Sequence, residues 1–206
     1  MKSLMKPLKT HVKESIFDNV EDITNSDAAL IEQFLKDNYE IDGTYIIEGS
    51  YTIKDNVVDV KGSLEVKNEK IKSLTNGLFR FGKVGGNFDC YRCKNLTSLG
   101  GAPEEVGRVF WCAFCPNLKS LEGGPELVGD DFNCFACSSL TSLEGAPKKV
   151  GGDFNCYECE NLKTLKGAPK TVGGDFNCKK CPKLHSLKGI GVVRGNINKD
   201  FRSNAH

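Results

Sequence analysis

The chain has 206 residues, of which 39% are hydrophobic and 27% are charged, a composition typical of a folded protein rather than a disordered one. Its 28 basic and 27 acidic side chains nearly cancel, which argues against a dedicated nucleic-acid-binding protein. No apolar run reaches the ~20 residues of a membrane-spanning helix, and the first residues lack the apolar core of a signal peptide. We therefore expect a protein that stays inside the cell that makes it.

The first 22 residues predict a basic N-terminal arm. Four lysines are interspersed with four apolar residues, namely Lys2, Lys6, Lys9 and Lys13 with Leu4, Leu8, Val12 and Ile16. Such a segment is either a solvated tail or a short amphipathic helix that docks on a partner or on an anionic surface. Both interpretations stay open at this stage.

Residues 23–55 predict an N-terminal cap that combines a helix with strands. An amphipathic helix is expected over residues 25–40, with Ser26 or Asp27 as its cap. Its apolar face is predicted to contain Leu30, Ile31, Phe34 and Leu35. The strand-like residues 43–66 then lead into the rest of the chain.

A Cys-x-x-Cys motif recurs five times with a step of 22 residues. The five pairs contain all ten cysteines of the chain: Cys90/Cys93, Cys112/Cys115, Cys134/Cys137, Cys156/Cys159 and Cys178/Cys181. The surrounding residues repeat as G-A-P-x-x-V-G-G-D-F-N-C-x-x-C-x-x-L-x-S/T-L-x-G. A fixed period of this length predicts a solenoid, in which each coil buries its apolar face against its neighbours.

Within one repeat, a short strand is expected around Phe154 and Cys156. These residues alternate with Asp153, Asn155 and Tyr157, the period of two that is typical of a strand with one buried face. Glycine pairs and Gly-Ala-Pro segments interrupt the chain between such strands, so no long helix fits there. The predicted inward set is Val150, Phe154, Cys156, Cys159, Leu162 and Leu165, with the same positions in the other repeats.

The spacing F-x-C-x-x-C-x-x-L resembles the core of a leucine-rich repeat, L-x-L-x-x-N/C-x-x-L. In that comparison Cys156 takes the last strand position and Cys159 takes the position of the Asn/Cys ladder. The longer phrase LTSLEGAPKKVGGDFNC, residues 140–156, resembles leucine-rich-repeat proteins of tailed-phage and gut bacterial genomes. The resemblance implies a location in the cytoplasm of a bacterial host or in the virion.

The expected fold is a mainly β, leucine-rich-repeat-like solenoid of 22-residue coils with a parallel sheet on one face, preceded by a short α-helical N-terminal segment. The solenoid is predicted to span residues 56–198, with the five cysteine coils at residues 84–189. Degenerate coils, with Leu64 and Val66 at one end and Ile197 at the other, are expected to cap it. Residues 199–206 are expected to form a C-terminal tail.

Cysteine pairs at this spacing fit several roles. Cys-x-x-Cys is half of a four-cysteine zinc site, and two neighbouring coils together contain four such ligands. Disulfides are disfavoured by the reducing interior of a cell, and a redox centre requires one accessible pair rather than five. The favoured interpretation is that the thiols are small buried hydrophobic groups, the second of which donates weakly to a backbone carbonyl.

Other chemistry is weakly indicated. A column of Asp131, Asp153 and Asp175 offers oxygen ligands for calcium, and solvated turn-flanking acids are the alternative. The three histidines are dispersed along the sequence, at His11, His185 and His206, and their spacing suggests no catalytic or metal-binding cluster. We therefore expect a non-enzymatic protein without a cofactor.

The outward strand positions are the ones that vary between repeats. We predict that they form a protein-binding face, because exposed aromatic residues beside acids are typical of interaction hot spots. The predicted binding residues are Tyr91, Trp111, Phe135, Tyr157, Asp131, Asp153, Asn155 and Asp175. Cross-strand packing that only stabilises the sheet is the alternative. The partner and the oligomeric state are left open, and a structural protein of the virion and a zinc- or calcium-stabilised array are the competing functions.

Overall fold

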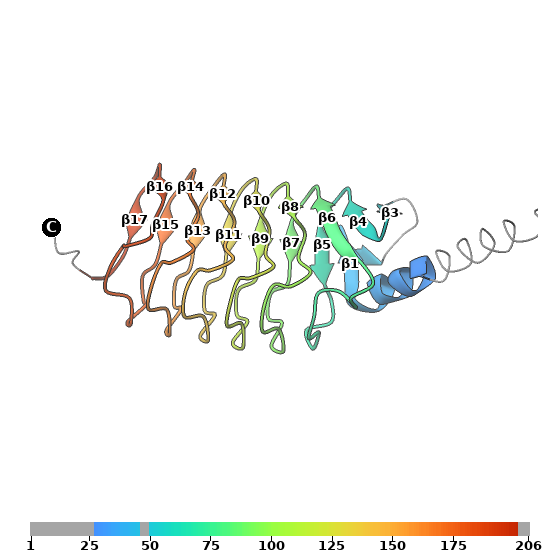
Figure 1. Ribbon diagram of the computed structural model, residues 1–206, viewed down its shortest axis with the longest axis horizontal. Helices are drawn as coiled ribbons and strands as arrows, with labels where there is room; N and C mark the ends of the chain where they lie inside the picture. The colour runs from blue at the N-terminus through green and yellow to red at the C-terminus, as the bar shows by residue number, and fades with distance from the viewer. Residues whose placement is uncertain (1–26, 46–49, 202–206) are drawn as a thin grey trace, which may run out of the picture.

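The computed structural model describes residues 27–45 and 50–201, and the chain folds as an elongated β-solenoid whose coils stack along one axis (Figure 1). The solenoid is mainly β, with coils of about 22 residues and one short helix at its N-terminal end. The predicted arm at residues 1–22 lies outside the described residues, as does most of the predicted tail. Among the residues described, no helix has the length and apolar character needed to cross a membrane.

Each full coil contributes one short strand to each of two sheets. Sheet A has nine strands, in the spatial order β2 (Thr44–Tyr45), β1 (Tyr39–Ile41), β5 (Leu64–Val66), β7 (Phe88–Asp89), β9 (Phe110–Trp111), β11 (Phe132–Asn133), β13 (Phe154–Asn155), β15 (Phe176–Asn177) and β17 (Ile197–Asn198). Sheet B has eight, in the order β3 (Tyr51–Lys54), β4 (Val57–Val60), β6 (Arg80–Val84), β8 (Glu105–Val106), β10 (Leu127–Val128), β12 (Lys149–Val150), β14 (Thr171–Val172) and β16 (Val192–Val193). Sheet A is the predicted parallel sheet from β5 onward. Its strand in the fourth cysteine coil ends at Asn155, so Cys156 lies just past the strand and not at its last position. Sheet B was not predicted. It forms because the residues just before the V-G-G glycines also pair from coil to coil.

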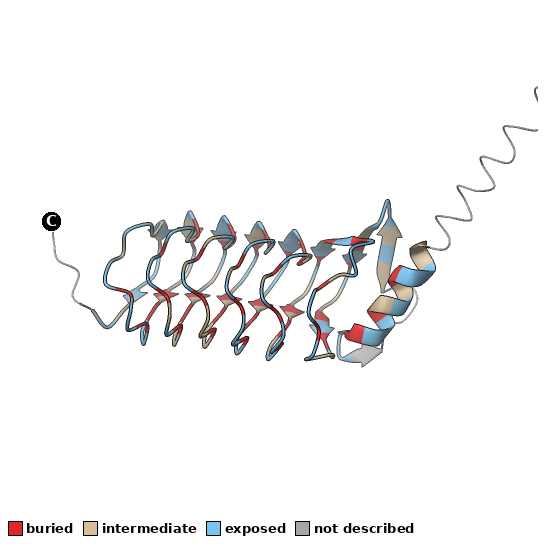
Figure 2. Cartoon of the chain, turned by 60° about the horizontal axis from the view of Figure 1, so that its bottom comes forward, coloured by how far each residue is buried: buried red, intermediate tan, exposed pale blue. Residues whose placement is uncertain are grey.

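The core is a set of aligned columns between the two sheets. We call the coils with Cys90, Cys112, Cys134, Cys156 and Cys178 the first to fifth cysteine coils. Their strand phenylalanines are fully buried and stack with ring centroids 5.1–5.2 Å apart: Phe88, Phe110, Phe132, Phe154 and Phe176. The predicted inward residues are buried in the same way except Leu187 of the fifth coil, which is partly buried, and buried segments follow the inside of each coil (Figure 2). The 5 Å ring spacing matches the ~4.8 Å separation of paired strands.

A column of glycines lets the coils approach this closely. A Cβ atom on Gly151 would lie 1.8 Å from the carbonyl oxygen of Gly129 in the preceding coil. The same contact recurs at Gly173, where the distance to the Gly151 oxygen would be 1.9 Å. The first glycine of the repeated V-G-G segment is therefore required by backbone packing, which sets the register of the solenoid.

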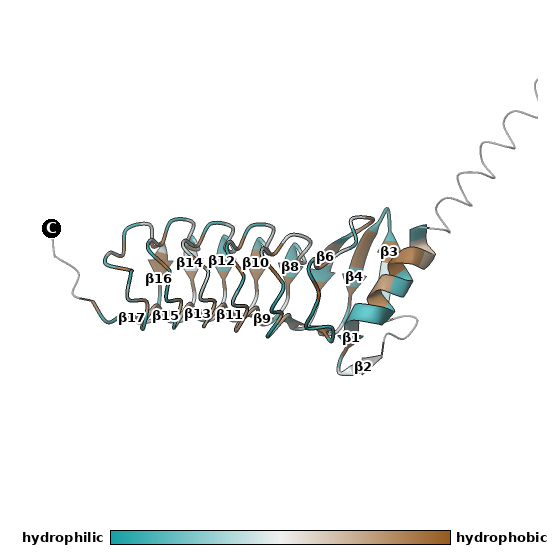
Figure 3. Cartoon of the chain, turned by 90° about the horizontal axis from the view of Figure 1, so that it is seen from below, coloured by the Kyte–Doolittle hydropathy of each residue, from teal (hydrophilic) through white to brown (hydrophobic). Residues whose placement is uncertain are grey.

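The N-terminal end is closed by the predicted cap. The helix covers residues 27–38 and leads directly into β1, which pairs antiparallel with β5. Ile31 and Leu35 are buried on the helix face toward the core, and Phe34 is partly buried. The helix has apolar residues on one side and polar ones on the other (Figure 3). The placement of Leu30 on the buried face is wrong, because its side chain is 51% exposed: it lies about 100° around the helix from Ile31.

The degenerate coils also occupy the predicted positions. Leu64 pairs in register with Phe88, and Leu64 and Val66 are buried. At the other end Ile197 pairs in register with Phe176. Ile197 is 38% exposed, so the last described coil covers the core less completely than the first.

Candidate interaction surface on sheet A

Three columns of residues lie on the outer side of sheet A, and the first is a hydrogen-bonding ladder. In each of the last three cysteine coils, an aspartate accepts a bond from a backbone N–H one coil further on. Asp131 Oδ1 accepts from Asp153 N at 2.8 Å, and Asp153 Oδ1 accepts from Asp175 N at 2.7 Å. Asp175 Oδ1 accepts from Asn196 N at 2.7 Å. These carboxylates therefore join neighbouring coils, which neither the predicted binding role nor the calcium interpretation anticipated.

The second glycine of the V-G-G segment makes room for this ladder. A Cβ atom on Gly152 would lie 2.2 Å from Asp131 Oδ1, and one on Gly174 would lie 2.0 Å from Asp153 Oδ1. The third coil has Asp130 in place of this glycine, and the coil before it has Val109 in place of the aspartate. At this step the glycine and the preceding carboxylate are both replaced, whereas Gly86 is kept beside Ser63, whose Oγ accepts from Asn87 N at 3.0 Å. The two positions are therefore expected to work as a unit.

The second column changes character along the solenoid. Glu40, Glu65, Asp89, Trp111, Asn133, Asn155 and Asn177 follow one another in register on adjacent strands. We call the fourth and fifth cysteine coils the regular coils. In them the side chain caps the next turn: Asn155 Oδ1 accepts from Tyr157 N at 3.0 Å, and Asn177 Oδ1 accepts from Lys179 N at 3.2 Å. Asp89 does the same for Tyr91 N at 2.7 Å. The Trp111 side chain contains no hydrogen-bond acceptor, so it cannot cap the next turn as Asp89, Asn155 and Asn177 do.

The third column contains an aromatic cluster, defined here as Tyr91, Phe114 and Phe135. Phe114 makes edge-on contacts with both neighbours, with ring centroids 5.4 Å from Tyr91 and 5.0 Å from Phe135. It belongs to the second coil, in which Ala113 takes the in-register position and is fully buried. The small side chain of Ala113 leaves room for the Phe114 ring to bridge the first and third coils.

The alternation of outward and buried residues does not point to Phe114. Its backbone has φ 55°, a left-handed conformation that is unusual for a bulky residue. The equivalent turn position has Arg92, Ala136, Glu158 and Lys180 in the other coils, all with positive φ. Phe114 is 41% exposed, so an aromatic ring stands on the surface where other coils have small or polar residues.

The remaining predicted aromatic residue, Tyr157, lies under a cation. Lys180 Nζ is 4.9 Å from the centre of the Tyr157 ring and 2.8 Å from Glu158 Oε1. Hydrogen bonds from the ammonium to the Glu158 carboxylate and to the Tyr157 side-chain oxygen raise the pKa of Lys180. Tyr157 is therefore engaged in contacts within the solenoid, and Tyr91 is contacted by Phe114 and by Arg92, which lies 4.9 Å from the centre of its ring.

The cysteines lie inside the coils, and all ten are free and buried. The second thiol of a pair donates to the carbonyl of the first cysteine one coil earlier: Cys137 Sγ is 3.1 Å from Cys112 O, and Cys159 Sγ is 3.2 Å from Cys134 O. Burial raises the pKa of Cys93 and Cys115 to about 12, so both thiols stay protonated at neutral pH. Within the described residues, no three His, Cys, Asp or Glu side chains are grouped as a metal site requires. The thiol geometry favours the buried-hydrophobe interpretation.

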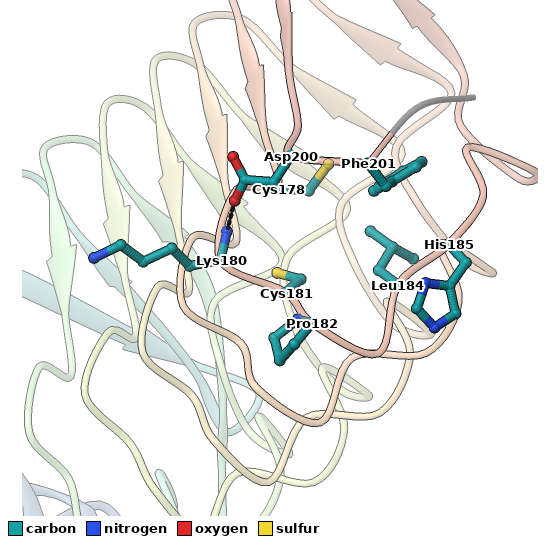
Figure 4. Close-up of a pocket in the computed structure, with 8 residues that line it drawn as sticks. All are labelled: Cys178, Lys180, Cys181, Pro182, Leu184, His185, Asp200 and Phe201. Carbon is teal, nitrogen blue, oxygen red and sulfur yellow. Dashed lines mark hydrogen bonds between the residues drawn. The ribbon is translucent and has the colours of Figure 1, made fainter.

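An open cavity of about 300 Å³ lies at the C-terminal end of the described solenoid (Figure 4). Its lining residues are Cys178, Lys180, Cys181, Pro182, Leu184, His185, Asp200 and Phe201. Asp200 Oδ2 accepts from the backbone N–H of Lys180 at 2.6 Å, and Phe201 packs on the core cluster. The last described coil pairs with the strands of the fifth one but leaves this part of it open, and Cys181 is 6% exposed there.

The predicted binding residues thus divide into three groups. Asp131, Asp153, Asp175 and Asn155 hold coils and turns together, and Tyr157 lies under Lys180. Tyr91 and Phe135 gather with Phe114 over the first three cysteine coils, and Trp111 lies in the adjacent column of the second coil. Comparisons of the chain with protein-family models, with curated proteins and with solved structures give no match. The functional argument therefore depends on this surface alone.

Proposed function

We propose that the protein is a non-enzymatic repeat scaffold that binds a protein partner through the outer face of sheet A. The binding surface is centred on the aromatic cluster with the neighbouring Trp111. The observation that supports this most strongly is Phe114, a partly exposed ring on a left-handed backbone that bridges two aromatic neighbours. Strained backbone and exposed aromatic rings both concentrate at binding sites.

The solenoid supports this function because its core and ladders leave the surface free to vary. The glycine, cysteine and phenylalanine columns have nearly the same residues in each cysteine coil. The aromatic cluster interrupts this regularity in one place, on the side of a sheet that repeat proteins commonly use for binding. The resemblance to leucine-rich-repeat proteins supports the same proposal, with a bacterial cytoplasm or a virion as the location.

Affinity capture from the native source, followed by measured affinity for the captured partner, tests the proposal. Phe114→Ser and Trp111→Ala are expected to weaken partner binding about 10-fold or more, as loss of an aromatic hot spot does. Thr171→Ser, on the outer side of sheet B, is the matched control and is expected to bind as the wild type does. Unchanged affinity in both aromatic variants would overturn the proposal.

A further inference from the structure

Three carboxylates stand side by side at the N-terminal end of the second column. Glu40 pairs in register with Glu65, and Glu65 with Asp89, on strands that lie about 4.8 Å apart. Like charges directly opposite one another on a sheet repel. In the part of the chain that the structure describes, no lysine, arginine or histidine forms an ion pair with any of the three. The sheet therefore carries a local negative charge that no ion pair among the described residues neutralises.

The environment of these carboxylates reflects that repulsion. Partial burial raises the pKa of Glu65, and the nearby charges of Asp89 and Glu40 raise it further. Burial also raises the pKa of Asp89, against the bond that this side chain accepts from Tyr91 N. A cationic side chain placed over the three strands would relieve this unfavourable arrangement.

Aromatic rings continue the same surface. Trp111 is the next residue in register after Asp89, and Tyr91 lies in the turn that follows β7, where its backbone N–H donates to Asp89 Oδ1 at 2.7 Å. The result is a strip with carboxylates at one end and rings at the other, which we call the acidic-aromatic strip: Glu40, Glu65, Asp89, Trp111 and Tyr91. An occupant of matching chemistry has lysines interspersed with apolar side chains.

We infer that the acidic-aromatic strip is the docking site of the chain's own N-terminal segment, residues 1–16. This segment has Lys2, Lys6, Lys9 and Lys13 among apolar residues, with Glu14 as its one acidic residue. Its charge is opposite to that of the strip, and its apolar residues suit Trp111 and Tyr91. The segment belongs to the same molecule, so its effective concentration at the strip is about millimolar.

The chain is long enough for this contact. The described helix begins at residue 27 and leads directly into β1, the strand that carries Glu40. Its 12 residues span about 18 Å. The ten residues from 17 to 26 reach at most about 35 Å when extended, whereas β1 and β9 are only three strand spacings, about 14 Å, apart.

This inference shares part of a surface with the proposed function, because Trp111 and Tyr91 belong to both. A partner that binds the aromatic cluster would then compete with the N-terminal segment. The inference does not require the partner, however, and its test uses the purified chain alone. Its failure would leave the partner-binding proposal standing.

Trp111 is the only tryptophan in the chain, so its fluorescence reports on the strip directly. The experiment measures acrylamide quenching of the full-length protein at low salt. One variant, called the segment variant, reverses the charge of the four lysines (Lys2→Glu, Lys6→Glu, Lys9→Glu, Lys13→Glu). Its quenching constant is expected to be about twice that of the wild type, and ~0.5 M NaCl is expected to remove the difference by screening the charges.

A matched control reverses four exposed lysines outside the strip: Lys119→Glu, Lys163→Glu, Lys170→Glu and Lys188→Glu. It changes the net charge equally and is expected to quench as the wild type does. A third variant neutralises the strip with Glu40→Gln, Glu65→Gln and Asp89→Asn, in which asparagine still accepts from Tyr91 N. The quenching constant of this third variant is expected to rise as it does in the segment variant, with an unchanged circular dichroism spectrum.

Equal quenching in the wild type and in the segment variant would overturn the inference. An effect of the segment variant without an effect of the neutralised strip would place the segment elsewhere and would also overturn it. Protection of Trp111 that increases with protein concentration, together with dimers in sedimentation, would assign the strip to a second copy instead. Restored protection when a synthetic peptide of residues 1–16 is added to the segment variant is the result that supports it.

Discussion

The fourth and fifth cysteine coils differ from the second in how they use the outer side of sheet A. In the regular coils Asp153 and Asp175 bridge to the next coil, beside glycines that leave them room. The second coil has Val109, Trp111 and Phe114 where bridging, capping and small or polar turn residues stand elsewhere. Repetition thus marks positions that hold the solenoid together, and exceptions to it mark positions available for recognition.

The largest effect is expected from the glycine column of the regular coils. Gly151→Ala places a Cβ atom 1.8 Å from a backbone oxygen that cannot move without separating the coils. The free energy of unfolding is expected to fall by about 3 kcal/mol or more, measured by urea denaturation. Gly100→Ala is the matched control, because its nearest neighbour would be Ser98 Oγ at 3.5 Å, and a loss of equal size there would contradict the packing argument.

A second prediction breaks the aspartate ladder. Asp153→Ala removes the acceptor of the Asp175 N–H, and the free energy of unfolding is expected to fall by about 1–2 kcal/mol. Adding a ladder residue to the second coil sharpens the comparison. Val109→Asp alone is expected to destabilise, since Asp130 occupies the glycine position, whereas Val109→Asp with Asp130→Gly is expected to recover stability. Additive effects in this double-mutant cycle would show that the two positions do not act as a unit.

A third prediction concerns the thiols inside the coils. An unfolded thiol ionises near pH 8.5, whereas Cys93 and Cys115 in the folded chain have pKa values of about 12. Between these values the unfolded state binds fewer protons, so the free energy of unfolding is expected to fall as the pH rises above about 9. Denaturation at pH 7 and pH 10 measures this change, and greater stability at pH 10 would contradict it.

The same burial predicts how the thiols react. Native protein at pH 8 is expected to resist alkylation, with Cys181 at the open C-terminal end modified before the interior cysteines. Mass spectrometry of partly modified protein identifies the order. Early modification of Cys115 or Cys137 would show that the interior of the solenoid is more open than its packing indicates.

The repeat itself made much of this fold predictable. A strict period of 22 residues, with Phe154 and Cys156 alternating with polar residues, was enough to predict the coils, the sheet A strands and the buried set. Sheet B was not predictable in the same way. Its strands, such as Lys149–Val150, run directly into the glycine pair and show no alternation of their own, and they form through hydrogen bonds to neighbouring coils.

The functional surface was predictable only in part. Trp111 and Tyr91 stood out as aromatic residues at outward positions, but Asp153 also alternates with buried residues and so resembled an exposed binding residue. Its acceptor role depends on an N–H 22 residues away, which no local pattern indicates. Phe114 lies one position outside the expected column, and the signal that reveals it is the pairing of a small Ala113 with a bulky residue at a left-handed turn.

The central claim is that regular coils supply stability and the irregular second coil supplies binding, and a crossed measurement on two variants tests it most directly. Urea denaturation and partner affinity are measured for Asp153→Ala and for Phe114→Ser in the same protein. The account predicts that Asp153→Ala lowers the free energy of unfolding and keeps partner affinity. Phe114→Ser is expected to change the free energy of unfolding by less than about 0.5 kcal/mol and to weaken the partner about 10-fold. Loss of stability without loss of affinity in Phe114→Ser would show that the aromatic cluster is only a packing feature of the sheet.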